Sequence, residues 1–282
     1  MSGPLGVSSL SALLQDSGQL VTQGLVEGFQ YQLQVFTSNG TFTPPTPPAG
    51  YEIAYYIGTV YAGGYSGDKA AANPYYETIR GGRNGGRKSV RISVAEMGSS
   101  QAITVGSGGA TKTSEGTGNA GTASSIGSLL TSPVTSAISP TPYGDLASSS
   151  GAGRGGDGGQ LFGDSDAATA TNGSSGGDTP WAVGGDGGVI TSGWGGSVRS
   201  PGAGSAGGID GDHTYGGSGG GGGAARHKSG TRAQDGAAGG APAGGGGAGG
   251  AGNGGIYAGC GYGGAGARGQ ADILTVFKPI AT

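Results

Sequence analysis

In the last fifth of this chain, a small residue occurs at every third position. Eleven successive positions, taken at every third residue, are all glycine or alanine: Ala237, Gly240, Ala243, Gly246, Gly249, Gly252, Gly255, Ala258, Gly261, Gly264 and Ala267. A period of three matches the left-handed polyproline II conformation, which completes one turn in three residues and rises about 3.1 Å per residue. Such a segment has no internal hydrogen bonds, so its backbone groups need partners on neighbouring segments. The pattern therefore predicts packed glycine rods, because only glycine permits so close an approach.

The composition agrees with this interpretation and excludes several common classes of protein. Glycine supplies 72 of 282 residues, hydrophobic residues 33% and charged residues 11%, which leaves too little Leu, Ile, Val and Phe for ordinary enzyme cores. Only 13 prolines are present and no strict G-X-Y period covers the chain, so collagen is excluded. A net charge of −3 is too small for a disordered polyelectrolyte and gives no reason to expect binding to nucleic acid or an anionic membrane.

The N-terminal segment does not resemble a secretory signal. Residues 1–18 have neither a cationic region nor a continuous apolar run, and no stretch approaches the roughly 20 apolar residues of a membrane span. We therefore expect synthesis in the cytoplasm without a signal peptide, and no membrane insertion. The single cysteine, Cys260, cannot form an intrachain disulfide, so cysteine usage does not identify the compartment.

Segments on both sides of the glycine-rich block have the patterns of β-strands. Residues 29–35 alternate aromatic or aliphatic side chains with glutamine, the period of two of a half-buried strand. Asn39–Gly40, between Val35–Phe36 and Thr41–Phe42, predicts a hairpin. Further strands, rich in β-branched and aromatic residues, are expected at 51–61, 88–97, 101–106 and 271–279. Strands so distant in sequence predict one small β-domain that the C-terminal strand closes.

The predicted fold is mainly β plus irregular structure, in four parts. Residues 1–28 form an N-terminal segment, 29–132 the β-domain, 133–270 a bundle of glycine-rich helices of the polyproline II type with connecting loops, and 271–282 the closing strand. In the first part, Leu10, Leu13 and Leu14 fit one face of a short helix that is not stable alone. This stripe suits either attachment to another protein or packing on its own domain.

Shorter glycine runs divide the block into rods and loops. The runs are 151–159, 184–188, 193–196 and 216–223, and about eight residues would span roughly 25 Å at the polyproline II rise. The stretches between them are expected to be loops that carry any recognition; they are 160–175, 178–183, 197–205, 209–215 and 224–238.

Three landmarks resemble the glycine-rich domain of bacteriophage tail-fibre and minor tail proteins. The first is VFTSNGTFTPPTPPAGYEIAYYIGTVYAGGYSG at 35–67, the second ITVGSGGATKTSEGTGNAGTASSIGSLLTS at 103–132 and the third GYGGAGARGQADILTVF at 261–277. They occur in the family's order and extend from about residue 35 to 278, so the resemblance is to most of the chain. The sequence departs from the family in two places: the glycine cluster after the first strand is reduced to Ala62-Gly63-Gly64, and residues 1–28 have no counterpart.

The resemblance implies both an architecture and a function. In related phage adhesins the glycine segments form a packed bundle of polyglycine II helices, and variable loops at its tip contact the host. By this resemblance the chain is a non-enzymatic tail-tip or tail-fibre protein of the virion that binds a host cell-surface glycan or protein. Residues 1–28 would attach it to other tail or baseplate proteins. The oligomeric state stays open between a homotrimer and a single copy on a trimeric stalk.

The expected loops hold most of the block's aromatic and basic residues, which interface hot spots and sugar-binding platforms use. The candidate receptor-binding residues are Trp181, Trp194, His213, Tyr215, Arg226, His227, Lys228 and Arg232. An alternative of equal weight is that the two tryptophans cap the bundle as an apolar plug. The candidate structural glycines, where a side chain would hold neighbouring rods apart, are Gly246, Gly249, Gly252, Gly255, Gly261 and Gly264.

Motifs for catalysis or cofactor binding are weak. GAGRGG at 151–156 fits a dinucleotide-binding pattern, but the match is nearly inevitable among so many glycines and no βαβ unit surrounds it. GAARHKS at 223–229 has His227 where a phosphate-binding loop requires glycine. DGDH at 210–213 has calcium-type ligands without the nonapeptide repeats of calcium-binding β-rolls. Neither histidine fits a nucleophilic triad. We expect no enzyme activity, cofactor or metal.

Two other functions stay open. The chain would be a structural virion component if its loops bind nothing specific, or a glycine-rich bacterial surface protein if it is not encoded by a phage. Substitutions in the loops distinguish an adhesin from a structural component, since only the adhesin would lose adsorption to its host.

Overall fold

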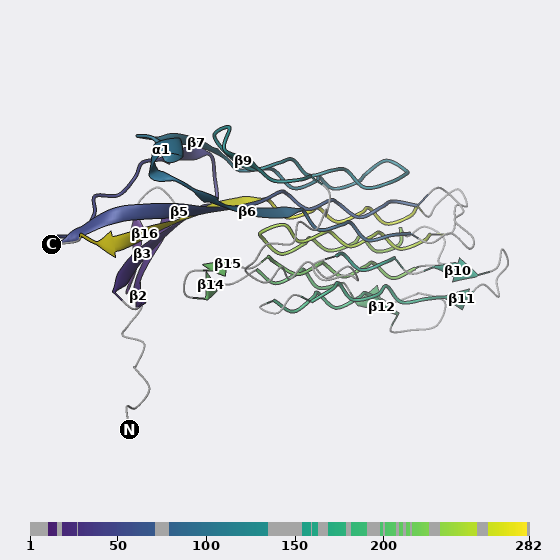
Figure 1. The fold of residues 1–282 in the computed structure, drawn as a ribbon. Helices are drawn as coiled ribbons and strands as arrows, with labels where there is room; N and C mark the ends of the chain where they lie inside the picture. Colours follow the sequence, from purple (N-terminus) through teal and green to yellow (C-terminus); the bar gives the residue numbers. More distant parts are fainter. Residues whose placement is uncertain are drawn as a thin grey trace, which may run out of the picture.

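The computed structural model describes most of the chain. The described residues are 28–70, 79–134, 154–158, 160–162, 169–178, 182–190, 198–199, 201–206, 209–210, 213–214, 216–225, 232–252 and 259–280. Only the backbone is described at 11–15, 19–26, 161–162, 169–170, 198–199, 209–210 and 213–214. They form a β-domain at one end and an elongated bundle of glycine-rich segments at the other (Figure 1). The expected mainly-β fold with very little helix is confirmed, as two larger antiparallel sheets, three two-stranded hairpins and one four-residue helix in the described part of the chain.

The larger sheet joins strands from both ends of the chain. Its order is β1 (Ser11–Gln15), β2 (Gln19–Val26), β3 (Phe29–Phe36), β16 (Gln270–Pro279), β5 (Tyr51–Tyr61) and β6 (Arg87–Ile92). All of these pairings are antiparallel, and Leu274 of β16 lies opposite Leu33 on one side and Ile57 on the other. The prediction that a C-terminal strand closes the β-domain is therefore confirmed.

The N-terminal strands correct the prediction of a short helix. Residues 11–15 and 19–26 form β1 and β2, which extend the sheet beyond β3, so Leu13 and Leu14 are neighbours on a strand. Leu10 lies outside the described residues. The physical reason is that the first helical turn is costly to nucleate, whereas β3 offers a row of backbone partners that a strand can use at once. The sheet thus begins upstream of residue 29.

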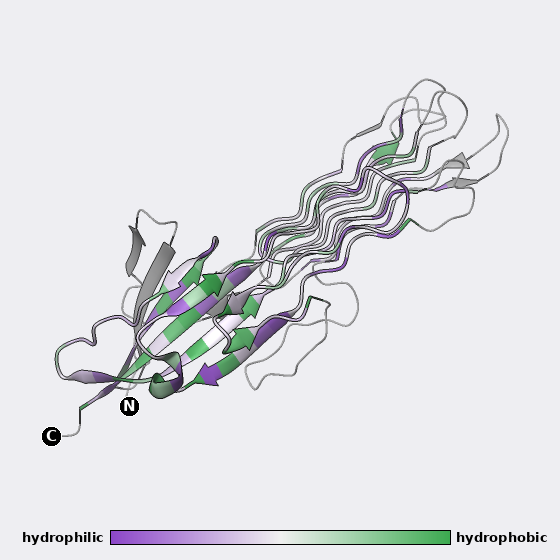
Figure 2. Ribbon diagram, turned by 90° about the horizontal axis from the view of Figure 1, so that it is seen from above, coloured by the Kyte–Doolittle hydropathy of each residue, from purple (hydrophilic) through white to green (hydrophobic). Residues whose placement is uncertain are grey.

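The smaller sheet packs on the larger one and encloses the main core. It consists of β4 (Gly40–Phe42), β7 (Gln101–Thr104), β8 (Ser125–Ile126) and β9 (Leu130–Thr131). Phe42 and Tyr56 are fully buried and meet edge to face, with ring centroids 5.7 Å apart and an interplanar angle of 86°. Figure 2 shows the alternation of hydrophobic and hydrophilic residues along the strands that this packing requires.

Two local predictions in this region are wrong. Asn39–Gly40 does not close a hairpin, because β3 and β4 belong to different sheets and β4 pairs with β7. Asn39 instead accepts a hydrogen bond from the backbone of Val105 at 2.8 Å. The chain crosses between the sheets here, and this crossing places Phe42 in the core that they share.

The predicted strand at 88–97 stops at Ile92 and is followed by helix α1 (Val94–Met97). A capping box starts the helix: the backbone of Glu96 donates to Ser93, and the backbone of Ser93 donates to the Glu96 carboxylate at 2.8 Å. The backbone and side-chain hydrogen bonds from Ser93 hold the pKa of Glu96 below its usual value. The sequence signal for this turn is the S-x-x-E pattern of Ser93 and Glu96.

We predict that Tyr56 makes the fold sensitive to alkaline pH. Burial raises the pKa of its phenol above the ordinary value, so the folded state keeps the proton where the unfolded chain loses it, above about pH 10. Stability should therefore fall as the pH rises through that value. Tyr56→Phe, which cannot ionise, should lose less stability than the parent between about pH 9 and 11 in urea denaturation. Equal losses in both proteins would show that this ionisation does not limit alkaline stability.

The glycine-rich segments, called rods here, run side by side along the long axis of the molecule (Figures 1 and 2). They begin at residue 62, well inside the part predicted as β-domain, and they include residues other than glycine. The rods within the described residues are 62–70, 79–86, 105–112, 118–124, 154–158, 171–178, 182–188, 201–206, 216–225, 232–240, 243–252 and 259–269. Several stretches predicted as loops are thus partly rod.

Hydrogen bonds from the central rod, residues 243–252, repeat every three residues. Gly246 and Gly249 both donate to carbonyls of rod 62–70, at 2.9 and 3.1 Å. The residue after each of them donates to rod 232–240, at 2.8 Å in both cases. Successive N–H groups therefore point to different neighbours, and the same neighbour is met again one triplet later.

Six described rods surround the central one and exchange backbone hydrogen bonds with it. They are 62–70, 79–86, 154–158, 216–225, 232–240 and 259–269. A Cβ atom added at any of five candidate structural glycines would overlap a backbone carbonyl of a neighbouring rod; these are Gly246, Gly249, Gly252, Gly261 and Gly264. Gly255 lies outside the described residues. The rods are joined through their backbones, and the missing side chains are what permits it.

A small apolar cluster lies between the rods, away from the β-domain. It contains Ile79, Cys260 and four alanines, Ala70, Ala225, Ala248 and Ala251, all buried. The Cys260 thiol accepts a hydrogen bond from the backbone of Gly252 at 3.4 Å. Alanine replaces glycine in the central rod at positions 248 and 251, three residues apart, because there the neighbouring rods leave room for a methyl group.

Candidate functional site

The rods define two ends of the bundle. Rod 62–70 continues from β5 and so runs away from the sheet. The central rod 243–252 runs in the same direction beside it, and rod 216–225 runs in that direction beside the central rod. Rods 79–86, 232–240 and 259–269 return toward the sheet. Hairpin β10 (Leu161–Phe162) with β11 (Thr169–Ala170) lies at the far end, and hairpin β14 (Ile209–Asp210) with β15 (His213–Thr214) lies beside the β-domain (Figure 1). A third hairpin pairs β12 (Val189–Ile190) with β13 (Val198–Arg199).

The candidate receptor-binding residues are divided between these ends. His213 belongs to β15, beside the β-domain, and pairs in register with Asp210. Arg232 begins a returning rod and therefore lies at the far end. The other candidates lie outside the described residues: Trp181, Trp194, Tyr215, Arg226, His227 and Lys228. The sequence grouped these residues by composition, but the alternating direction of the rods separates His213 from Arg232 by the length of the bundle.

Arg232 stacks on the ring of Tyr262 and is paired with Asp235. Its guanidinium carbon lies 3.7 Å from the ring centroid, and its Nη2 donates to Asp235 at 2.8 Å. The second carboxylate oxygen of Asp235 accepts from the backbone of Tyr262 at 2.7 Å. Tyr262 and Asp235 together therefore fix the orientation of the guanidinium, and the Arg232 side chain remains 38% exposed.

A second cation approaches the same ring from another rod. The Lys69 ammonium nitrogen lies 5.2 Å from the Tyr262 centroid and donates to the carbonyl of Thr113 at 2.9 Å. Stacked guanidinium groups keep donors at their edge for carboxylate, phosphate or hydroxyl acceptors, so this cluster can bind polar groups of a ligand. No local pattern in the sequence indicates Tyr262 and Lys69, because only the pairing of rods brings residues so far apart in the chain together.

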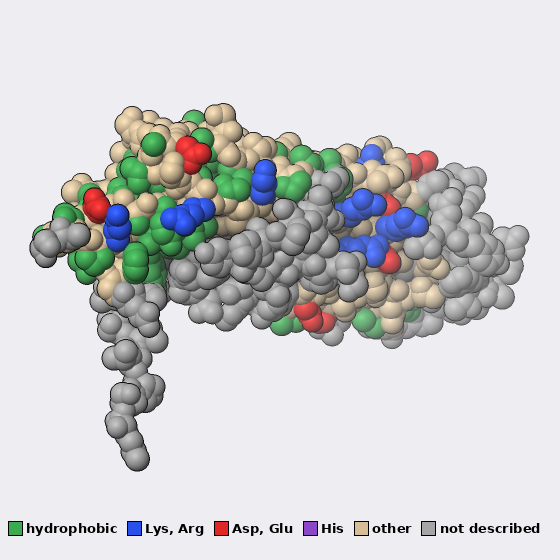
Figure 3. Space-filling view, in the orientation of Figure 1, with side chains coloured by type: hydrophobic (Ala, Val, Ile, Leu, Met, Phe, Trp, Pro, Cys, Tyr) green, Lys and Arg blue, Asp and Glu red, His purple; other side chains and the backbone are tan. Residues whose placement is uncertain are grey.

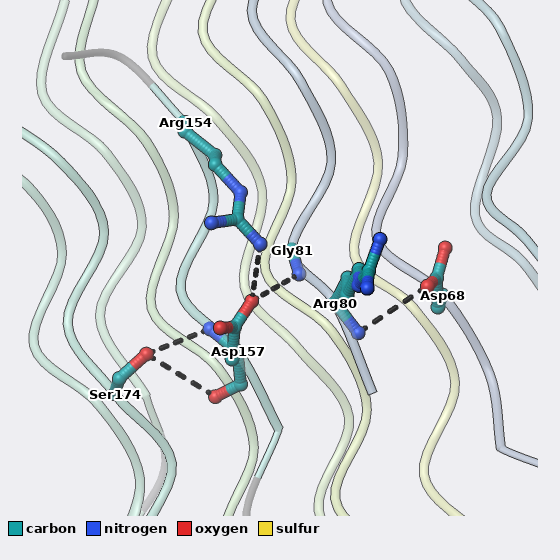
Figure 4. Close-up of polar contacts among 6 residues, drawn as sticks. All are labelled: Asp68, Arg80, Gly81, Arg154, Asp157 and Ser174. Atoms are coloured by element: carbon teal, nitrogen blue, oxygen red, sulfur yellow. Dashed lines mark hydrogen bonds and ion pairs between the residues drawn. The ribbon is translucent and has the colours of Figure 1, made fainter. Parts of the chain in front are cut away.

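Carboxylates on the side of the bundle link rods to one another (Figure 4). Asp157 accepts from the Arg154 side chain at 2.6 Å and from the backbone of Gly81 at 2.9 Å. Its own backbone donates to Ser174 at 2.7 Å. Asp68 accepts from the backbone of Arg80 at 3.2 Å. These acids replace a carbonyl acceptor where the rods need one, which is a structural role and differs from that of a catalytic acid.

The described residues show how part of one candidate motif is bonded and whether potential metal ligands gather. Within GAGRGG, the N–H groups of Gly155 and Gly156 donate to Gly82 and Gly220 at 2.9 and 2.8 Å, so neither is available to a phosphate. No cluster of three or more potential metal ligands occurs among the residues that the structure describes. In the same residues no helix is long and apolar enough to cross a membrane.

Comparison with known proteins adds no identification. No protein-family model matches this chain, and no curated protein is similar to it at a significant level.

Proposed function

We propose that this chain is a bacteriophage tail-fibre or minor tail protein that binds the surface of the host cell. The observation that carries the proposal is the central rod with six hydrogen-bonded neighbours, which makes a stiff shaft out of segments with almost no side chains. The three sequence landmarks of glycine-rich tail proteins at 35–67, 103–132 and 261–277 support the same family.

The rods are proposed to be polyglycine II helices. Their support is the triplet spacing of hydrogen bonds to the same neighbour and the triplet of glycine and alanine in the sequence, since this conformation has three residues per turn and only external partners. Such a lattice satisfies the backbone without an ordinary hydrophobic core. This explains how a chain so poor in large apolar residues holds an extended shape.

The receptor is proposed to bind at the far end of the bundle. Each outward rod is followed in the chain by a return rod, so the described ends of several rods meet there. The cluster of Arg232, Tyr262 and Lys69 supports this placement with two cations over one ring, the residue types that interfaces favour. The proposed ligand is a glycan or protein of the host surface, and no chemical reaction is involved.

The β-domain is proposed to face the virion. The N-terminal strand β1 is at one edge of the larger sheet, and an edge strand can pair with another chain. Residues 1–28 would in this way attach the protein to other tail or baseplate proteins. The protein would be made in the cytoplasm of the host and reside in the virion, as a homotrimer or as a single copy on a trimeric stalk.

The test is binding of the fluorescently tagged full chain to intact cells from a panel of bacteria. We expect selective labelling of one strain, and competition by the phage that encodes the protein. Arg232→Ala should reduce labelling about tenfold, because it removes a charged contact and the guanidinium that packs on the Tyr262 ring. The control is Lys278→Ala, a half-exposed cation at the opposite end, whose ion pair with Glu52 spans 3.0 Å. No labelling of any strain by the folded protein would favour a structural virion component.

A further inference from the structure

A row of arginines follows the segment that returns from the far end of the bundle to the sheet. Arg80 and Arg83 lie in rod 79–86, and Arg87 and Arg91 lie in β6, which continues from it. Arg80, Arg83 and Arg91 are exposed, and Arg87 is half-buried. Along the chain the intervals are about 9 Å in the rod and about 13 Å in the strand. The four residues, called the arginine row, extend over roughly 35 Å.

Tyrosines accompany the row on the neighbouring outward segment. The guanidinium carbon of Arg91 lies 3.8 Å from the ring centroid of Tyr55, and that of Arg87 lies 5.6 Å from the ring centroid of Tyr61. Farther out, the backbone of Tyr65 donates to the carbonyl of Arg83 at 2.8 Å. Arg87 lies opposite Tyr61 and Arg91 lies opposite Ile57 in the pairing of β5 with β6. Because side chains alternate along a strand, both arginine–tyrosine pairs lie on the same face of the sheet. Arginine and aromatic side chains therefore follow one line.

The outer arginines carry charge that the described residues do not neutralise. The side chains of Arg80 and Arg83 have no hydrogen bond or ion pair with any residue that the structure describes, although Asp68 accepts from the backbone of Arg80. Arg154, on the adjacent rod, is by contrast paired with Asp157. Figure 3 shows Lys and Arg side chains recurring along the long axis of the molecule on one face. In a protein with a net charge of −3, this line is a local concentration of positive charge.

We propose that the arginine row binds an extended anionic polysaccharide of the bacterial surface along the side of the bundle. Guanidinium groups form paired hydrogen bonds with carboxylate or phosphate, the anionic groups that such polymers carry. The spacing of 9 to 13 Å favours a sparsely charged polymer over nucleic acid, in which phosphates follow one strand every 3.4 Å or so. The inference rests on the proposed function and adds a second contact, separate from the far-end cluster.

The experiment measures binding of the full chain to polymers of defined charge by fluorescence anisotropy. The probes are a polyuronate, a polysaccharide of sugars joined by phosphodiesters, neutral dextran and single-stranded DNA. We expect one of the two anionic glycopolymers to bind, with binding weakened by salt, and the polymer that binds identifies carboxylate or phosphate as the recognised group. The double variant Arg80→Gln/Arg83→Gln should bind it at least tenfold more weakly, because two charged contacts are lost.

Lys88→Gln is the matched control. Lys88 is exposed on the same segment but pairs in register with Val60, on the opposite face of β6, and its removal should change affinity less than twofold. Unchanged binding by the double variant, equal binding of dextran, tighter binding of the DNA, or no binding of either anionic glycopolymer would each overturn the inference. Thermal melting confirms that the variants are folded.

Cell labelling separates failure of this inference from failure of the proposed function. If the double variant labels the host strain as strongly as the parent, the arginine row is not used and the adhesin proposal stands. If the polymer binds through the row but no strain is labelled, the polysaccharide site stands and the adhesin proposal fails.

Discussion

Gly261→Ala is expected to lower the free energy of unfolding by about 3 kcal/mol or more, since a single methyl group cannot be accommodated there. A Cβ at this position would overlap the carbonyl of Gln234 on one neighbouring rod and lie 3.0 Å from the backbone nitrogen of Gly250 on another. Both obstacles are hydrogen-bonded backbone, which cannot rotate away as a side chain does. Urea denaturation of the parent and the variant measures the difference.

Gly259→Ala is the matched control, two residues away on the same rod. Gly259 is exposed, and its added Cβ would meet only the side chain of Arg232, at 3.8 Å. We expect a change within about 0.5 kcal/mol. Gly252→Val, near the end of the central rod, should be as damaging as Gly261→Ala. Similar midpoints for Gly259→Ala and Gly261→Ala would contradict the close packing of the rods.

Phe42→Ala is expected to cost about 3 to 5 kcal/mol, the range for a large aromatic side chain removed from a core. Phe42 has no exposed surface and contacts Tyr56 edge to face between the two sheets. The cavity would also destabilise the segment that connects β3 in the larger sheet to β4 in the smaller one. Denaturant unfolding, followed by the fluorescence of the tyrosines and tryptophans, measures the loss.

Phe29→Ala provides the comparison for that loss. Phe29 begins β3 and is 43% exposed, so its truncation should cost less than about 1 kcal/mol. A loss for Phe42→Ala as small as that for Phe29→Ala would mean that the smaller sheet does not pack firmly on the larger one.

The local sequence pattern was sufficient to predict some strands of the fold. The alternation in 29–35 and the β-branched residues of 51–61 and 271–279 predicted strands that the structure contains. These predictions succeeded because successive side chains of a strand point to opposite faces of the sheet, and an apolar face has to be buried. Pattern failed at Asn39–Gly40, where the turn signal is real but the partner strand is β7 instead of β3.

The candidate site was only partly predictable from the sequence. Composition identified Arg232, but its partners Tyr262 and Lys69 come from two other rods, and no local signal joins them. The arginine row was missed for another reason. Its members, Arg80, Arg83, Arg87 and Arg91, lie in a region predicted as β-domain, and only the course of rod 79–86 into β6 aligns them.

The sequence by itself determined the kind of contact that this protein makes. Every third residue from Ala237 to Ala267 is glycine or alanine, so the backbone has to find its partners on other segments at very short range. Tertiary structure alone decided which segments those are and in which direction each one runs. Glycine carries no side chain that could distinguish one neighbour from another, so the lattice is fixed by the β-domain at its base, by Asp68 and Asp157 between rods, and by where each rod turns.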